Sequence, residues 1–322
     1  MTKKTFKYIL KGSTTLFIMA VMLIILFNPK RYLQTTYVGL KLWATTVLPS
    51  LLPFFFLTAL LQGSGVIFLL ARVFKRPARL LFNADGIVIY IRILSLISGY
   101  PVGAKIIADL YSNGIIDSSQ AKKYALFCST SGPIYIVGTV ACGLLSSPRL
   151  GFVLLLTHYL TSLINGLIFR KLPDNGHIAP LLTKQATNNA LYDAMFSAVS
   201  TLTLLGGFIA VFYTFCQIAL DFKLLTPLIS LLTPVLGKDL STGMALGLIE
   251  CTSGCQYIST LMKSDLSVCI ISQIIAFGGV SVWVQSMAYL NKAKVSFFWF
   301  ALSKIVQTLT AFPICYILLK VV

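Results

Sequence analysis

The stretch that decides the fold reads ISGYPVGAK at residues 97–105, where two glycines and a proline interrupt an apolar segment. Three similar interruptions follow, namely STSGP at 129–133, ECTSGCQ at 250–256 and FGGVS at 277–281. Proline lacks the N–H that continues a helix, and glycine adopts backbone conformations that other residues avoid. The interruptions fall as one pair in each half of the chain, a pattern typical of the broken helices around a transporter's substrate site.

The residues around these breaks are apolar enough to indicate a membrane protein. Of the 322 residues, 57% are hydrophobic and only 11% are charged, whereas a soluble domain carries about 25% charged residues. The runs 16–27, 152–168, 202–220 and 297–319 approach the length that crosses about 30 Å of hydrocarbon, some with their flanks. These runs are apolar on every side, which favours helices over barrel strands. The sequence therefore predicts an all-α polytopic membrane protein.

The formal net charge of +17 is spread through short loops and does not lie along one face. Lysine and arginine in such loops set membrane topology and attract anionic headgroups. We therefore expect a lipid bilayer with anionic headgroups and a small-molecule solute as partners, and no nucleic acid; a homo-oligomer is left open. The basic N-terminus precedes an apolar run without a small-residue cleavage site, which indicates a retained anchor helix with a cytoplasmic start.

Basic clusters assign a path through the membrane. Arg72, Lys75, Arg76 and Arg79 mark an inside loop after crossings near 12–28 and 37–62. The segment 87–111, broken near its middle, is predicted to be a re-entrant hairpin, and crossings near 124–146 and 150–169 follow. The second half repeats this upside down, with crossings near 192–221, 266–290 and 297–319 and a hairpin near 242–262. Short stretches at 66–83 and 224–240 are predicted to be interfacial.

This path predicts seven transmembrane helices plus two re-entrant hairpins in an inverted repeat. The predicted domains are an N-terminal anchor helix at 1–36, a first repeat at 37–170, a cytoplasmic linker at 171–191 and a second, inverted repeat at 192–322. A topology in which every apolar segment spans the membrane is the alternative.

The breaks supply the candidate substrate-binding residues. A hairpin tip at mid-membrane depth exposes backbone groups that survive only when buried in protein or facing a water-filled cavity. In the second break, three hydroxyls precede a half-helix whose N-terminal end suits an anionic or strongly polar ligand. The alternatives are a simple helix kink and a serine-lined packing kink. The candidates are Gly99, Tyr100, Pro101, Gly103, Lys105, Ser129, Thr130, Ser131, Gly132, Ser253, Gln256, Gly278, Gly279, Ser281 and Gln285.

Glu250 is the only acid in the middle of an apolar segment, and an intramembrane charge is costly without a partner or water. It is predicted to bind a coupling ion or a proton, or to accept a hydrogen bond from the substrate; the alternative is a structural ion pair with Lys105 or Arg92. Lys105 either neutralises an anion or snorkels to the inner surface. Lys304, close to a helix end, is expected to snorkel.

Mainly structural roles are predicted for His158, Trp283 and the seven cysteines. His158 is expected to make an ordinary helix contact. Trp283 adds an aromatic face to the fourth break or fills space against lipid. The seven cysteines show no paired CxxC spacing and are interpreted as small apolar packing residues.

Signatures of enzyme chemistry are missing from the sequence. It contains no P-loop, no HExxH, no dinucleotide fingerprint and no GxSxG elbow. With only 9 acids and 2 histidines, the chain offers no catalytic cluster. We expect no enzyme activity, no cofactor and no metal.

Four blocks carry a resemblance to a known family: GYPVGAK at 99–105, NGI at 113–115, FCSTSGPIYIVG at 127–138 and FGGVSVWVQ at 277–285. Together they resemble the YlbJ-like sporulation integral membrane proteins of the nucleoside-recognition (Gate) group, over roughly residues 40 to 290.

The resemblance implies a multi-pass inner-membrane protein of endospore-forming bacteria, with paired Gate repeats like those of nucleoside carriers and a place in a forespore membrane. It also implies movement of dipicolinate, a small dicarboxylate. Taken with the breaks, it predicts a secondary transporter or facilitator of a small, polar, anionic solute, dipicolinate-like or nucleoside-like. The alternative is a non-transporting scaffold or assembly factor for the spore envelope.

Overall fold

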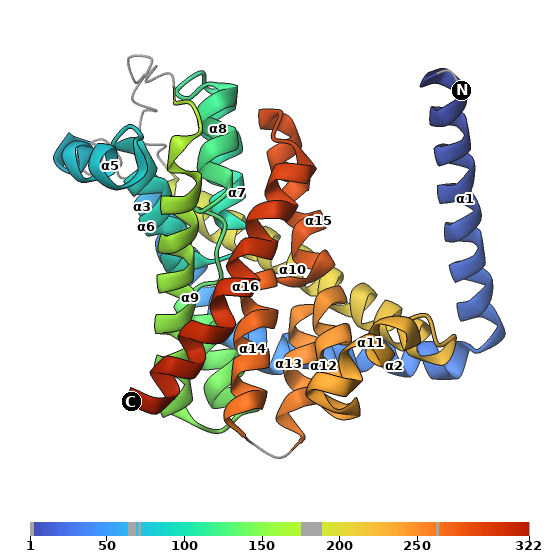
Figure 1. Ribbon diagram of the computed structural model, residues 1–322. Coiled ribbons are helices and arrows are strands. Elements are labelled where there is room, and N and C mark those ends of the chain that lie inside the picture. The colour runs from blue at the N-terminus through green and yellow to red at the C-terminus, as the bar shows by residue number, and fades with distance from the viewer. Residues whose placement is uncertain (1–2, 64–68, 70–71, 175–188, 262–263, 322) are drawn as a thin grey trace.

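The computed structural model describes residues 3–63, 69, 72–174, 189–261 and 264–321, and within these ranges helices make up all of the regular structure (Figure 1). Five helical segments are long and apolar enough to cross a membrane. The predicted all-α membrane architecture is thus confirmed, while the count of seven crossings stays a prediction. The five segments are Pro29–Leu61, Pro148–Lys171, Ala190–Asp221, Asp265–Ala293 and Phe297–Val321.

The first half begins with α1 (Lys3–Phe27), which stands apart from the other helices in Figure 1. A long helix with one π-helical stretch and then a series of shorter helices follow. In chain order these are α2 (Pro29–Leu42), η1 (Trp43–Val47), α3 (Leu48–Gly63), α5 (Lys75–Phe82), α6 (Ile87–Ser98), α7 (Val102–Ser112), α8 (Ser118–Ala125), the π-helix η2 (Ile134–Leu144), α9 (Pro148–Ile168) and η3 (Phe169–Lys171).

The second half presents the same order of elements: a long helix, a short outer helix, a pair of short helices, a broken helix and a long helix. They are α10 (Ala190–Asp221), α11 (Thr226–Leu236), α12 (Lys238–Ile249), α13 (Cys251–Ser259), α14 (Asp265–Phe277), α15 (Gly279–Leu290), η4 (Asn291–Ala293) and α16 (Phe297–Val321). In Figure 1, α5 and α8 lie at the upper end of the bundle and α11 to α13 at the lower end. An inverted repeat places the corresponding elements of its two halves at opposite ends of the bundle, as α5 and α11 lie here. The domain boundaries stay a prediction. Most of the linker 171–191 lies outside the described residues.

The paired short helices are too short to cross a bilayer one by one. At 1.5 Å per residue, the 12 residues of α6 and the 11 of α7 rise about 18 Å and 16 Å, against about 30 Å of hydrocarbon. The members of each pair, α6 with α7 and α12 with α13, pack against one another. Their geometry is that of two helical hairpins, and their re-entrant placement in a membrane stays a prediction.

All four interrupted sequences lie at breaks between helices. The α6–α7 turn contains Gly99, whose φ of +78° lies in the left-handed region that favours glycine. Residues 126–132 are not helical, and η2 begins after Pro133. Glu250 separates α12 from α13, and Gly278 separates α14 from α15. The sequence therefore located every break correctly.

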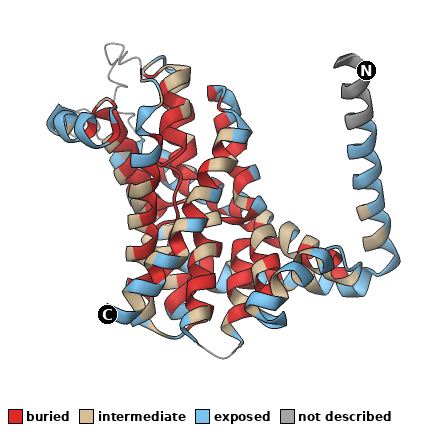
Figure 2. Ribbon diagram, in the orientation of Figure 1, coloured by how far each residue is buried: buried red, intermediate tan, exposed pale blue. Residues whose placement is uncertain are grey.

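The short outer helices lie at the edge of the bundle. Helix α5 bends by 83° from α6, and α11 has no buried residue. Figure 2 shows buried residues concentrated in the bundle, while most of residues 12–27 in α1 and much of α5 and α11 are exposed. Positions outside the bundle suit the predicted interfacial role, although part of the stretch 66–83 lies outside the described residues.

The long helices of the two halves pack antiparallel through polar and small residues. At one end Arg31 of α2 forms an ion pair with Asp221 of α10. Further along, the hydroxyls of Thr36 and Thr214 lie 2.8 Å apart. Close approach through small and hydroxyl residues is how helices associate in lipid, where apolar burial between helices supplies little driving force.

Replacing Gly206 by valine should destabilise the protein through this interface. A Cβ at Gly206 would lie 2.5 Å from the Trp43 ring, whereas a Cβ at the neighbouring Gly207 would meet nothing within 4 Å. We expect Gly206→Val to lower the free energy of unfolding by about 1–3 kcal/mol. Thermal unfolding in detergent checks this, with Gly207→Val as the matched control. Equal midpoints for the two variants would contradict the packing.

Candidate functional site

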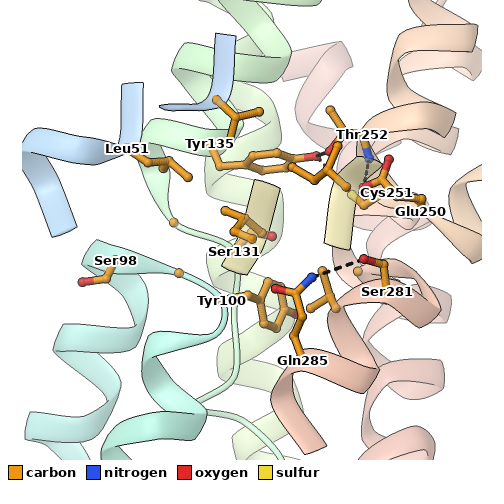
Figure 3. Close-up of a pocket in the computed structure, with 17 residues that line it drawn as sticks. Leu51, Ser98, Tyr100, Ser131, Tyr135, Glu250, Cys251, Thr252, Ser281 and Gln285 are labelled. Carbon is orange, nitrogen blue, oxygen red and sulfur yellow. Dashed lines mark hydrogen bonds between the residues drawn. The ribbon is translucent and has the colours of Figure 1, made fainter. Parts of the chain in front are cut away.

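All four helix breaks meet at one cavity between the two halves (Figure 3). Its lining comes from the end of α6 and the α6–α7 turn, from the segment before η2 and the start of η2, from the α12–α13 break, and from Gly278 and α15. Apolar side chains from η1, α3 and α10 close the remaining side. The lining residues are Val47, Leu51, Ser98, Gly99, Tyr100, Ser131, Gly132, Tyr135, Leu205, Ile209, Glu250, Cys251, Thr252, Gly278, Ser281, Val282 and Gln285.

Half of the predicted site residues line this cavity. Each of the four breaks contributes at least one of them, so residues up to 186 positions apart in the chain face one space, as Gly99 and Gln285 do. Gln285 donates to the Ser281 hydroxyl at 3.2 Å within that wall. The predicted residues that line the cavity are Gly99, Tyr100, Ser131, Gly132, Glu250, Gly278, Ser281 and Gln285.

Four of the other predicted residues lie behind the wall and hold it by hydrogen bonds. The backbone oxygen of Ser129 accepts from Lys304, and the Thr130 hydroxyl donates to the Ser95 carbonyl at 3.1 Å. Ser253 donates to Glu250, and Gln256 accepts from Tyr213 at 3.1 Å. These residues support the breaks and do not face the cavity.

Three more predicted residues serve close backbone packing. Pro101 is buried where α7 begins. A Cβ at Gly103 would lie 2.3 Å from the Cys128 carbonyl oxygen, and a Cβ at Gly279 would lie 2.9 Å from the Cys251 nitrogen. The small size of these two glycines lets each break approach its neighbour.

Lys105 lies away from the main cavity. Its ammonium donates to the Ser197 hydroxyl at 2.9 Å, and it lines a second, smaller cavity with Thr58 and Thr201. The hydroxyl of Ser98, which lines the main cavity, donates to Thr58 at 2.8 Å. A single hydroxyl pair therefore connects the walls of the two cavities.

The Glu250 carboxylate caps its own helix. It is 2% exposed and accepts from the backbone N–H groups of Thr252 at 3.0 Å and Ser253 at 2.5 Å, and from the Ser253 hydroxyl at 2.7 Å. The N-terminal end of α13 thereby compensates the negative charge. The alternative ion pair with Lys105 or Arg92 is wrong, because Arg92 instead donates to the Phe127 carbonyl at 3.0 Å.

Tyr135 and Thr252 are polar residues of the wall that sequence reasoning missed. The Tyr135 hydroxyl lies 3.2 Å from the Thr252 hydroxyl and 3.4 Å from the Cys251 sulfur, and so joins η2 to α13 (Figure 3). Tyr135 follows the STSGP break by two residues, a position that could have indicated it. Cys251, interpreted as a packing residue, also faces the cavity.

The expectation that Lys304 snorkels is wrong. Lys304 is completely buried, and its ammonium donates to the Tyr100 hydroxyl at 2.7 Å. His158 contacts the non-helical segment before η2 and not a helix, since its Nε2 accepts from the Ser131 backbone N–H at 2.9 Å. Trp283 is buried and donates to the Phe277 carbonyl at 2.7 Å across the α14–α15 break, so it does not face lipid.

The cavity volume is about 50 Å³. A water molecule needs at least about 10–15 Å³ of such space, and a cavity of about 150 Å³ takes up benzene. The cavity therefore has room for a few water molecules and is too small for a ring-sized solute in this conformation.

The chain has a relative among known proteins. The sporulation integral membrane protein YlbJ of Bacillus subtilis (strain 168) is 30% identical over 312 residues, an alignment that covers 88% of this chain and 76% of the relative. No protein-family model and no solved structure matches the chain. The similarity spans most of both proteins and is not confined to one motif.

Alanine at Gly99 should destabilise the cavity wall more than alanine at Gly114. Both glycines have a positive φ, but a Cβ at Gly99 would lie 2.4 Å from the Gly132 nitrogen, whereas a Cβ at Gly114 would meet nothing within 4 Å. We expect Gly99→Ala to cost about 1–3 kcal/mol more unfolding free energy than Gly114→Ala, measured by thermal unfolding in detergent. Equal losses for the two variants would show that the backbones at Gly99 and Gly132 do not pack closely against each other.

Proposed function

The chain belongs to the family of YlbJ sporulation integral membrane proteins, and from that premise we propose that it is a secondary transporter or facilitator of a small, polar, anionic solute. The observation that carries the proposal is the convergence of four helix breaks on one cavity. Non-helical backbone is tolerated at membrane depth where it is buried in protein or lines a cavity. Transporters place their substrate between broken helices in this way.

The charges around the cavity support an anionic solute. Glu250 is the only acid in the wall, and backbone amides already compensate its charge. The buried cation Lys304 donates to Tyr100, which lines the cavity, and the buried cation Arg92 donates to the Phe127 carbonyl, close to the second break. The positive potential from these groups favours a carboxylate or phosphate over a cation.

Polar groups in the wall would orient the solute. The hydroxyls of Ser131, Tyr135, Thr252 and Ser281 and the amide of Gln285 offer both donors and acceptors. The apolar side chains opposite them suit a ring face. This combination fits a small aromatic acid or a nucleoside-like molecule.

Transport requires the cavity to widen and to open to each side in turn. In the predicted topology the α6–α7 and α12–α13 hairpins enter from opposite surfaces. We infer that one half of the helix bundle moves against the other and opens a path past one hairpin at a time. Glu250 would bind a coupling ion or a proton, or contact the solute. Because Ser98 and Thr58 join the main cavity to the Lys105 cavity, this pair lies on one such path.

The remaining assignments follow from the same proposal. The protein would work in the cell (inner) membrane with its N-terminus in the cytoplasm, in sporulation at a forespore membrane. It would act without enzyme activity or a cofactor, with the solute and an anionic bilayer as partners.

We expect purified protein in proteoliposomes to take up labelled dipicolinate or uridine saturably, and Glu250→Gln to reduce uptake by about tenfold or more. Charge-assisted hydrogen bonds contribute about 1.5–3 kcal/mol each, and the substitution removes the charge that α13 binds. Initial uptake rates are measured under imposed proton and sodium gradients.

Asp239→Asn is the matched control, because it makes the same chemical change on an exposed residue of α12. Its uptake should equal that of the unmodified protein. Folded protein that takes up neither solute, or a Glu250→Gln variant with full uptake, would contradict the proposal. The first result would favour a scaffold in the spore envelope.

A further inference from the structure

Lys304 on α16 is completely buried, yet the partners of its ammonium among the described residues are all neutral. It donates to the Tyr100 hydroxyl at 2.7 Å, to the backbone oxygen of Ser129, and at 3.4 Å to the side-chain oxygen of Gln307. Among the residues that the structure describes, no carboxylate lies within ion-pair distance of it. The positive charge of the buried Lys304 ammonium is therefore not compensated by a negatively charged side chain among these residues.

This arrangement distinguishes Lys304 from a structural anchor. An unpaired charge within the membrane is costly, and residues of this kind mark ion paths and proton relays. Arginine keeps its charge when buried, whereas lysine gives up a proton readily. The position therefore suits a group that exchanges a proton with water.

The hydrogen bonds around Lys304 can be satisfied with or without that proton. The charged ammonium has three N–H donors, which match the three acceptors on Tyr100, Ser129 and Gln307. The neutral amine has two donors and one acceptor. If the Tyr100 O–H turns to donate to the amine, the other two bonds persist. Loss of the proton thus needs only the rotation of one hydroxyl.

We propose that Lys304 is a proton-binding site whose proton controls the Tyr100 hydroxyl. With the proton bound, the Tyr100 oxygen accepts from Lys304 and the hydroxyl hydrogen is available to the cavity that Tyr100 lines. Without it, that hydrogen turns toward the amine. One N–H bond forms or breaks, and the proton comes from water and returns to it. An anionic solute then binds best together with a proton, a step that rests on the proposed transport function.

The other titratable and charged groups near Lys304 are less suited to this role. His158 on α9 accepts a hydrogen bond at Nε2, which therefore carries no proton in this state, and Arg92 on α6 stays charged. Cys128, before η2, is a buried thiol whose sulfur lies 4.0 Å from the Val88 carbonyl oxygen. The α14 side chains that bond to α16, Ser272 and Gln273, do not titrate.

Unpaired polar atoms near Lys304 offer a route for the proton. The hydroxyl of Ser129, the Nε2 of Gln307 and the Nδ1 of His158 are buried and have no hydrogen-bond partner among the described residues. Two of these residues contact Lys304 directly. Such groups can bind transient water, which carries protons between buried sites.

Nitrogen-15 NMR of the full-length protein in liposomes, labelled at the lysine Nζ, tests the site without any solute. The Lys304 signal is assigned as the one that disappears in Lys304→Met and, should that variant not fold, in Lys304→Arg. Between about pH 5 and pH 9 we expect this signal to change from ammonium to amine, whereas lysines in water stay ammonium in this range. A Lys304 signal that stays ammonium throughout would overturn the proposal.

Dipicolinate uptake with and without an imposed proton gradient tests the coupling. We expect the gradient to accelerate uptake about 5-fold to 150-fold in the unmodified protein and in Lys41→Met. Lys304→Arg, Lys304→Met and Tyr100→Phe should lose that acceleration.

The outcomes separate the two proposals. Uptake accelerated equally in Lys304→Arg would overturn the coupling and leave the transport function standing. A Lys304 signal that titrates in folded protein that takes up neither dipicolinate nor uridine would support the proton site and contradict the transport function.

Discussion

The structure depends on one constraint, that a backbone polar group within hydrocarbon needs a partner inside the protein. A continuous helix meets this requirement by itself, but a broken helix does not. Four breaks, placed separately in lipid, would each leave amides and carbonyls without partners. Here they meet at one cavity, where Gly99 and Gly132 approach each other closely and Glu250 caps the α12–α13 break. The bundle is arranged so that the irregular backbone of each half faces that of the other.

This arrangement explains why the breaks carry small and hydroxyl residues. At 2.4 Å, the space that a Cβ on Gly99 would need is already occupied by the Gly132 backbone. The hydroxyls of Thr130, Ser131 and Ser253 lie where helical hydrogen bonds end, and two of them bond to a neighbouring carbonyl or carboxylate. The same residues therefore allow the backbones to pack closely and supply hydrogen bonds where the helices end. The remaining polar groups line the cavity.

The charges follow from the same constraint. Glu250 accepts hydrogen bonds from the amides of its own helix, whereas the ammonium of Lys304 donates only to neutral oxygens, two of them on Tyr100 and Ser129 in the first half. The two charged groups do not pair directly. Each is held by a broken element and both lie at or near the cavity wall, so a movement that separates the elements changes the surroundings of both groups. This is the physical link between the proposed solute site and the proposed proton site.

The amino-acid sequence was enough to predict a membrane protein, its helical class and the four breaks at the cavity, because apolar composition, proline and glycine act locally along the chain. It also indicated Glu250, the one acid in the middle of an apolar run, and the resemblance that the YlbJ relative confirmed. Only the tertiary structure decided which residues share the cavity. The sequence predicted snorkelling for Lys304 and, as one of two alternatives, for Lys105. The fold placed Lys105 in a second cavity and buried Lys304 beside Tyr100, 204 positions away in the chain. Contacts over such separations depend on how the helices pack, which local patterns do not specify.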